Sequence, residues 1–201
     1  ISDQVIELAG GGTDIILASV SYTLSTNVED LTMLDGAITG TGNASANTII
    51  RNRTDNIING GAGADFMDGG SAGGDTFVVD NVGDVVTGVS ATPDDISTVI
   101  SSVSFSANDI NLGSPDDDSL IYISNITLTG TAGVNAIGNT KVNVLVGNSA
   151  SNTLDGGFGA TLAVGDGNDT LNGGGGADTM IGRDGDDVSF VDNAGDVIIE
   201  G

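Results

Sequence analysis

Aspartates with a regular spacing are the residues of this chain best suited to carry chemistry. Asp169 and Asp187 are 18 residues apart, as are Asp178 and Asp196, and glycines precede each of them. Asp favours turns and oxygen-ligand sites, and glycine permits tight turns. If 18 residues close one coil, each pair of carboxylates is stacked ~4.8 Å apart. Like charges at that distance repel by roughly 3–4 kcal/mol at an effective dielectric near 20, so a cation is expected between them.

The available side chains restrict the identity of that cation. The chain has no Cys and no His, which excludes thiolate and imidazole sites for zinc, copper, haem and iron–sulfur clusters. Nucleophile systems of the Ser-His-Asp and Cys-His kinds are excluded for the same reason. Carboxylates and carbonyls alone suit a hard ion with roughly six to eight oxygen ligands in a flexible geometry. Calcium fits this better than magnesium, which requires a strict octahedron.

Composition narrows the class of protein further. Four basic residues stand against 28 acidic ones, and 25 of those acids are Asp. A net charge of -24 excludes nucleic acid as a partner, because no basic stripe exists to neutralise phosphates. The chain has 33 Gly, 5 Phe, 2 Tyr and no Trp, so its core must be thin and built from Val, Ile, Leu and Ala.

No apolar run approaches the ~20 residues that a transmembrane helix needs, so no transmembrane segment is expected. The chain starts without Met or a basic segment, and we expect it to be an interior window of a longer protein.

A nine-residue period predicts the elements that position the acids. Residues 42–78 divide into the rows GNASANTII, RNRTDNIIN, GGAGADFMD and GGSAGGDTFV. Residues 138–190 divide into GNTKVNVLV, GNSASNTLD, GGFGATLA, VGDGNDTLN, GGGGADTMI and GRDGDDVSF. The first six residues of a row predict a turn, and the last three predict a short strand with its central apolar residue pointing inward. Two rows close one coil, and the expected inward residues include Met67, Phe77, Leu171 and Met180.

A longer repeat encloses these rows. The phrase SVSY at 19–22 returns as SVSF at 102–105, and GDVVT at 83–87 returns as GDVII at 195–199. We predict a first unit at 1–83, with strand-rich coils followed by rows at 42–83. A second unit at 84–195 has strand-rich coils, a loop at 106–119 and rows at 138–195. A third unit begins at 196–201.

The rows GGAGADFMD, VGDGNDTLN and GGGGADTMI resemble the RTX, or haemolysin-type calcium-binding, nonapeptide G-G-x-G-x-D-x-U-x, as found in very large bacterial secreted repeat arrays. This resemblance implies an all-β fold, a right-handed parallel β-roll or β-helix solenoid with calcium-binding nonapeptide turns. It also implies Ca²⁺ between stacked turns, bound by sixth-position Asp residues and backbone carbonyls. The implied metal-site residues are Gly61, Gly63, Asp65, Asp75, Asp84, Gly165, Gly167, Asp169, Gly174, Gly176, Asp178, Gly182, Asp184, Asp187 and Asp196.

Several rows depart from this pattern at the sixth position, which is occupied by Asn47, Asn56, Asn143, Asn152 and Thr161. We expect these rows to be structural, with weak or absent metal, because stacked Asn side chains can hydrogen-bond along the coil. The four basic residues are expected to neutralise neighbouring acids; they are Arg51, Arg53, Lys141 and Arg183.

We therefore expect a structural module without enzymatic activity: a calcium-stabilised rod in a large secreted bacterial surface protein such as an S-layer, adhesin or matrix filament. It would fold outside the cell on binding calcium, and its other partners would be neighbouring repeats or copies of itself. The alternative is a calcium-dependent secretion and folding domain of a type I-secreted enzyme or toxin. A third possibility, carbohydrate or ice binding on a flat strand face, requires regular threonine ladders, and the sequence contains only fragments of them.

Overall fold

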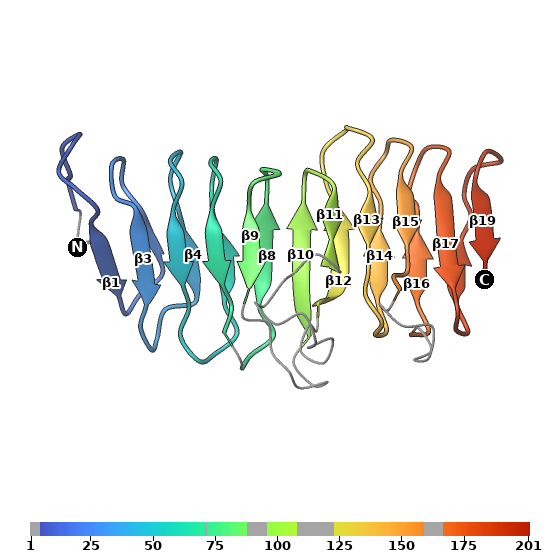
Figure 1. The fold of residues 1–201 in the computed structure, drawn as a ribbon, viewed down its shortest axis with the longest axis horizontal. Coiled ribbons are helices and arrows are strands. Elements are labelled where there is room, and N and C mark those ends of the chain that lie inside the picture. The colour runs from blue at the N-terminus through green and yellow to red at the C-terminus, as the bar shows by residue number, and fades with distance from the viewer. Residues whose placement is uncertain (1–4, 71, 88–95, 108–122, 159–166) are drawn as a thin grey trace.

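The computed structural model describes residues 5–70, 72–87, 96–107, 123–158 and 167–201, which form a parallel β-solenoid. Strands follow one another along a single long axis, with the two termini at opposite ends (Figure 1). Every strand pairing is parallel, which confirms the predicted all-β solenoid. No described element is a helix long and apolar enough to cross a membrane. The predicted loop at 106–119 falls largely outside the described residues, and so does Gly165.

The strands form three sheets. Sheet A contains β1 (Ile15–Ala18), β3 (Asp30–Met33), β5 (Thr48–Ile50), β7 (Phe66–Asp68) and β9 (Val85–Thr87). Sheet B contains β2 (Tyr22–Thr23), β4 (Thr39–Thr41), β6 (Ile57–Asn59), β8 (Thr76–Val79), β10 (Ser97–Ser101), β12 (Ile123–Leu128), β14 (Val144–Val146), β16 (Thr170–Asn172) and β18 (Val188–Phe190). Sheet C contains β11 (Phe105–Ser106), β13 (Ala136–Ile137), β15 (Thr153–Asp155), β17 (Thr179–Arg183) and β19 (Val197–Glu200). Consecutive strands alternate between sheet B and one of the other two, so sheets A and C follow one another along the wall that faces sheet B.

The core is a thin column of apolar side chains between these two walls. The central residue of each three-residue strand points inward, as the nine-residue period predicts. Met67, Phe77, Leu171 and Met180 are all fully buried, which confirms their predicted inward orientation. A fully buried side chain of this size contributes about 1.5–3 kcal/mol, so the solenoid's apolar stabilisation is spread evenly over its coils rather than gathered in one centre.

Strand register confirms that residues about 18 positions apart are stacked in the nonapeptide region. Thr48 pairs with Phe66, and Thr170 pairs with Val188. One coil is longer, because β14 pairs with β16 at a separation of 26 residues. The predicted row at 156–163 falls largely outside the described residues.

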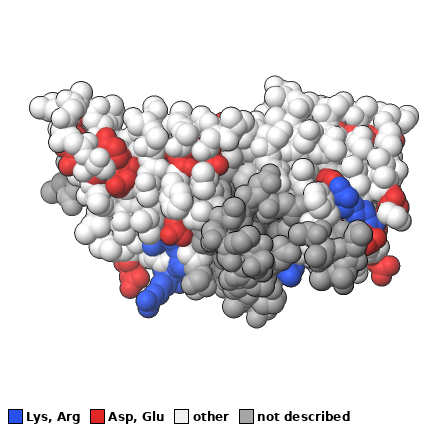
Figure 2. All heavy atoms as spheres, viewed as in Figure 1, with Lys and Arg blue, Asp and Glu red and all other residues white. Residues whose placement is uncertain are grey.

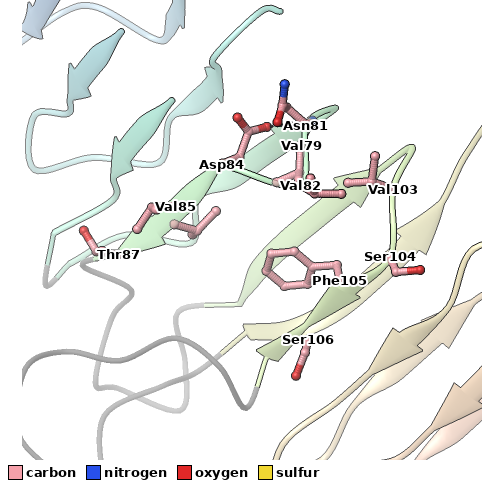
Figure 3. Close-up of a pocket in the computed structure, with 11 residues that line it drawn as sticks. Val79, Asn81, Val82, Asp84, Val85, Thr87, Val103, Ser104, Phe105 and Ser106 are labelled. Atoms are coloured by element: carbon pink, nitrogen blue, oxygen red, sulfur yellow. Dashed lines mark hydrogen bonds between the residues drawn. The ribbon is translucent and has the colours of Figure 1, made fainter. Parts of the chain in front are cut away.

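The wall opposite sheet B is interrupted between β9 and β11. Sheet B is continuous at this level, since β8, β10 and β12 are paired, but sheet A ends at β9 and sheet C begins at β11. A cavity of about 220 Å³ lies at the break, with Val82, Val85 and Phe105 in its lining. Figure 3 shows the Phe105 ring directed into this gap. Phe105 is accordingly only partly buried at this level.

Repeated phrases of the sequence are placed on opposite walls. SVSY at 19–22 leads into β2 of sheet B, whereas SVSF at 102–105 leads into β11 of sheet C. The second phrase occurs nine strands after the first among the described elements. Because walls alternate strand by strand, this odd number shifts equivalent strands by half a coil.

Candidate calcium-binding turns

The sixth residue of each row stands at the end of a turn, immediately before a strand. Turns leading from sheet B to sheet A or C form one edge of the solenoid, here called flank 1; turns leading back to sheet B form flank 2. On both flanks, the stacked sixth-position residues include runs in which Asn is followed by Asp. The runs are Asn47–Asp65–Asp84 and Asn152–Asp178–Asp196 on flank 1, and Asn143–Asp169–Asp187 on flank 2. Below Asn47, the same column continues through Glu29 and Asp14. The structure therefore brings together all three acid pairs selected from the sequence.

Asp65 shows how such a carboxylate is placed. Its Oδ1 atom accepts a hydrogen bond of 2.7 Å from the backbone N–H of Asn47 in the preceding coil. Its Oδ2 atom is buried and has no hydrogen-bond partner. The pKa of Asp65 is raised to about 6, mainly by burial; the hydrogen bond from Asn47 lowers it, and the nearby carboxylates of Asp84 and Asp80 raise it. This oxygen requires either a proton or a cation.

The same arrangement recurs at Asp178 and Asp187. Asp178 Oδ1 accepts a 2.7 Å hydrogen bond from the N–H of Asn152, and Asp187 Oδ1 accepts one of 2.7 Å from the N–H of Asp169. The Oδ2 atoms of Asp178 and Asp187 are both buried without a hydrogen-bond partner. Burial raises the pKa of Asp178, and the carboxylate of Asp196 adds to this effect. Partnerless carboxylate oxygens therefore occur on both flanks.

Glycines at two row positions make room for these carboxylates. At position one, a Cβ on Gly60 would lie 2.3 Å from Asp65 Oδ2, and a Cβ on Gly173 would lie 2.3 Å from Asp178 Oδ2. At position two, Gly174 has φ +77°, and a Cβ there would lie 2.5 Å from a carbonyl oxygen of the turn below. Carbonyls of one turn thus face the next turn, on the same flank as the carboxylates.

Asp84 and Asp196 differ from Asp65, Asp178 and Asp187 in the hydrogen bonds that their Oδ2 atoms accept. Asp84 Oδ1 accepts a hydrogen bond from Asp65 N–H, and its Oδ2 accepts from the N–H groups of Asp80 and Asn81 at 3.1 Å each. Asp196 repeats this pattern in its own turn. Those backbone donors lower the pKa of Asp196. These two carboxylates close their own turns, in rows that lack glycine at positions two and four.

The remaining selected residues are placed less uniformly. Asp75 is buried on flank 2 and precedes β8, but the residue stacked on it is Ser97, whose hydroxyl accepts a hydrogen bond from Asp75 N–H at 3.3 Å. Asp184 is exposed within the last flank 2 turn. The carbonyl oxygen of Gly167 lies 2.4 Å from the position of a Cβ on Gly185 in the turn above, so it faces the Asp187 turn.

Asn at the sixth position links coils through amide hydrogen bonds. The Asn47 side chain donates to the carbonyls of Val28 and Glu29 at 3.1 and 3.0 Å and accepts from Asn43 N–H at 2.7 Å. Asn152 donates to Val134 O at 2.6 Å. Related bonds are made by Asn56 and Asn143. The prediction that these Asn side chains hydrogen-bond along the coil is confirmed. Thr161, which holds the sixth position in its own row, lies outside the described residues.

A second set of Asn residues, at position two of the Asn rows, was not singled out from the nonapeptide pattern. Asn43 donates to the carbonyls of Ser25 and Val28 at 2.8 and 2.7 Å. Equivalent side-chain bonds to the coil below are made by Asn52, Asn139 and Asn148. The recurrent signal in the sequence is Asn at both positions two and six of one row, as in GNASAN and GNSASN.

Basic side chains are few, and one of them neutralises a buried acid at an outward strand position of sheet C. On the face shown in Figure 2, acidic side chains form several separate groups and basic ones appear in only a few places. Arg183 forms an ion pair with Asp155, with its Nη2 atom 2.6 Å from Asp155 Oδ2. The guanidinium also lies 4.7 Å from the centre of the Phe158 ring. For Arg183, the predicted neutralising role is confirmed.

A calcium ion fits the chemistry of these turns. The atoms available as metal ligands are oxygens only. Carboxylate oxygens without a hydrogen-bond partner lie on the same flanks as carbonyls that face the adjoining turn. No group of three or more acidic side chains converges among the described residues, so a site here combines one or two carboxylates with carbonyls. Calcium accepts such mixed sets at variable coordination number, whereas magnesium retains its water.

Comparison with known proteins identifies these turns. The family model described as the RTX calcium-binding nonapeptide repeat (4 copies) matches residues 41–77, 137–160 and 161–189. No curated protein and no solved structure matches the chain. The matched segments contain Asp65, Asp75, Asp169, Asp178 and Asp187. The chain therefore carries RTX calcium-binding nonapeptide repeats in a parallel β-solenoid, and Ca²⁺ is the ion that these repeats bind.

Proposed function

We propose that this solenoid is a structural rod of a secreted bacterial surface protein and that it folds outside the cell when calcium binds. The observation that carries the proposal is the set of buried, partnerless Oδ2 atoms of Asp65, Asp178 and Asp187. Without a cation, these oxygens oppose folding, because burial of an unpaired charge is unfavourable. With calcium bound, the same oxygens tie one coil to the next.

Three sites are proposed, each between stacked turns. The first lies between Asp65 and Asp84, the second between Asp178 and Asp196, and the third between Asp169 and Asp187. Carbonyl ligands are proposed from Gly61 and Gly63, from Gly174 and Gly176, and from Gly165, Gly167, Gly182 and Asp184. Since Asp84 and Asp196 already accept three backbone N–H groups each, the earlier Asp of those two pairs is proposed as the principal carboxylate ligand. Asp75 faces Ser97 instead of a second acid and is proposed as a weaker site.

The expected energetics make calcium a switch for folding. At ~1 mM external calcium and a dissociation constant near 10⁻⁴ M, each site adds about 1.4 kcal/mol to stability. Three such sites together add about 4 kcal/mol, which is close to the lower end of the ~5–15 kcal/mol stability of a whole domain. At sub-micromolar cytosolic calcium this contribution nearly vanishes. The chain would then remain unfolded inside the cell, in a form suited to export, and fold at the surface.

Circular dichroism of the 201-residue chain tests this function. In calcium-free buffer we expect an unfolded spectrum, and we expect β-structure to develop cooperatively as calcium is raised to 10 mM. Magnesium at equal concentration is the control and should restore little structure. Equal β-content and equal melting temperature in chelator and in calcium would contradict the proposal.

A further inference from the structure

The outer face of sheet B differs in chemistry from the rest of this acidic molecule. Each three-residue strand directs its central residue inward and its two flanking residues outward. The outward positions from β4 to β18 hold only Thr, Ser, Asn, Val, Ile and one Phe, and none is charged. By contrast, Asp30 and Asp68 lie on the outer face of sheet A, and Asp155 lies on that of sheet C.

Net charge limits how two such chains can approach one another. Each carries a net charge of -24, so most orientations bring carboxylates of the two molecules together. Among the described residues, the outward strand positions of sheet B bring no carboxylate to such a contact. Its outward side chains also include partly exposed apolar ones, such as Ile57, Val144 and Val188, whose contact with another apolar surface is favourable.

The regularity of the face favours a second copy over other partners. Its side chains repeat at the strand spacing of ~4.8 Å, which an identical sheet matches along its whole length. A sugar polymer is less suited, since Phe190 is the single aromatic residue at these outward positions. Ice binding is also less suited, because Thr alternates irregularly with Val, Ile and Asn along the columns. One column passes in register through Ile57, Thr76, Thr98, Asn125, Val144 and Thr170.

We propose that two copies of the chain associate through the outer faces of sheet B. The proposal rests on the proposed function, because it names the surface by which the rods would assemble. Eight strands at ~4.8 Å spacing give a face about 34 Å long, and three residues give a width of about 10 Å. Two such faces bury roughly 700 Å², which is less than the ~1,200 Å² of a stable complex. A single pair therefore associates weakly and reversibly, and tandem arrays add contacts along their length.

Disulfide trapping tests the face directly, because the chain has no native cysteine. Thr127 lies near the middle of sheet B and Thr48 lies on sheet A, and both are outward and half-buried. In calcium under mild oxidant, we expect Thr127→Cys to cross-link to its own copy at least tenfold faster than Thr48→Cys. Equal or slower cross-linking of Thr127→Cys would overturn the proposal.

A second pair of variants tests the role of charge. Val144 on sheet B and Phe66 on sheet A are 39% and 40% exposed. We expect Val144→Asp, introduced into the Thr127→Cys chain, to slow cross-linking at least fivefold, and Phe66→Asp to leave it unchanged. Equal effects of the two would overturn the proposal. Circular dichroism of the same samples monitors folding separately, so a chain that folds without calcium would contradict the proposed function while the cross-link still tests the face.

Discussion

The carboxylate of Asp65 accepts a hydrogen bond from the backbone N–H of Asn47, 18 residues earlier and one coil below. Asp178 and Asn152 have the same relationship on the same flank, at a separation of 26 residues. In each case the Asn side chain is bonded to a carbonyl of the coil beneath it. Each of these two Asn rows thus lies directly below a row whose sixth position is an acid.

Replacing Asp65 with Asn should remove one calcium site and leave the coil intact. An Asn side chain can still accept the hydrogen bond from Asn47 N–H, but it provides no charge for the cation. Isothermal titration calorimetry should show one fewer tightly bound calcium per chain.

Asp68→Asn is the matched control for that change. Asp68 lies in the same row, points outward, and uses its Oδ1 to accept from Gly70 N–H at 2.7 Å. Its replacement should leave the calcium stoichiometry unchanged. Equal loss of calcium in both variants would show that the acids act only through overall charge.

Without calcium, acid should stabilise the fold. The pKa of Asp65 is raised from 3.8 to about 6, so the folded state binds a proton more tightly than the unfolded state does. By linkage, the free energy of unfolding then rises as the pH falls from about 6 towards 4, and the penalty is fully present above pH 6. In calcium-free buffer, the β-structure measured by circular dichroism should increase when the pH is lowered from 7 to 5, and the increase should be smaller in Asp65→Asn. A β-content that falls as the pH is lowered over this range in the unsubstituted chain would contradict the assignment.

Asn152→Ala should destabilise the solenoid at any calcium concentration. The side chain is buried, donates to Val134 O and accepts from Asn148 N–H, so its removal leaves buried backbone groups without partners. We expect a loss of about 2–4 kcal/mol in the free energy of unfolding, measured with urea at 1 and 10 mM calcium. Asn125→Ala, which removes one outer-face hydrogen bond to Thr98, should cost less than about 1 kcal/mol. If 10 mM calcium restored the full free energy of unfolding to Asn152→Ala, the stabilisation by this amide would depend on calcium, which would contradict the prediction.

Two adjacent glycines give a sharp test of turn geometry. Gly174→Ala places a Cβ 2.5 Å from Asn148 O at a residue with φ +77°, and should destabilise the chain by more than about 2 kcal/mol. At Gly175 the nearest atom to a new Cβ is 3.8 Å away, so Gly175→Ala should change stability by less than about 0.5 kcal/mol. Thermal unfolding in calcium measures both, and similar losses would contradict the stacked-turn geometry.

The periodic parts of this fold follow directly from the sequence. Glycine, Asp and an apolar residue at fixed positions specify the turn, the acid stack and the inward side chain, which is why Met67, Phe77 and the Asp65–Asp84 pair could be located in advance. Each is determined by local backbone geometry repeated at a constant interval.

Features that depend on contacts between coils of different length or sequence could not be predicted from the nine-residue period. The separation of 26 residues between the paired strands β14 and β16 departs from the 18-residue period. Asp84 has the spacing of the other stacked acids, but its Oδ2 atom also accepts hydrogen bonds from Asp80 N–H and Asn81 N–H in its own turn. The break between β9 and β11 arises where one set of coils meets the next, and no single row encodes it.

The half-coil offset between SVSY and SVSF determines how repeated sequence is displayed to the outside. An antibody raised against one copy of the phrase would meet the second copy on the reverse side of the rod. One binding molecule could not bridge both copies along a single side. Adding or deleting one strand between the two phrases would place both on the same wall. The number of strands between repeats, independently of residue identity, therefore determines whether repeated phrases are displayed on one wall of the solenoid or on both.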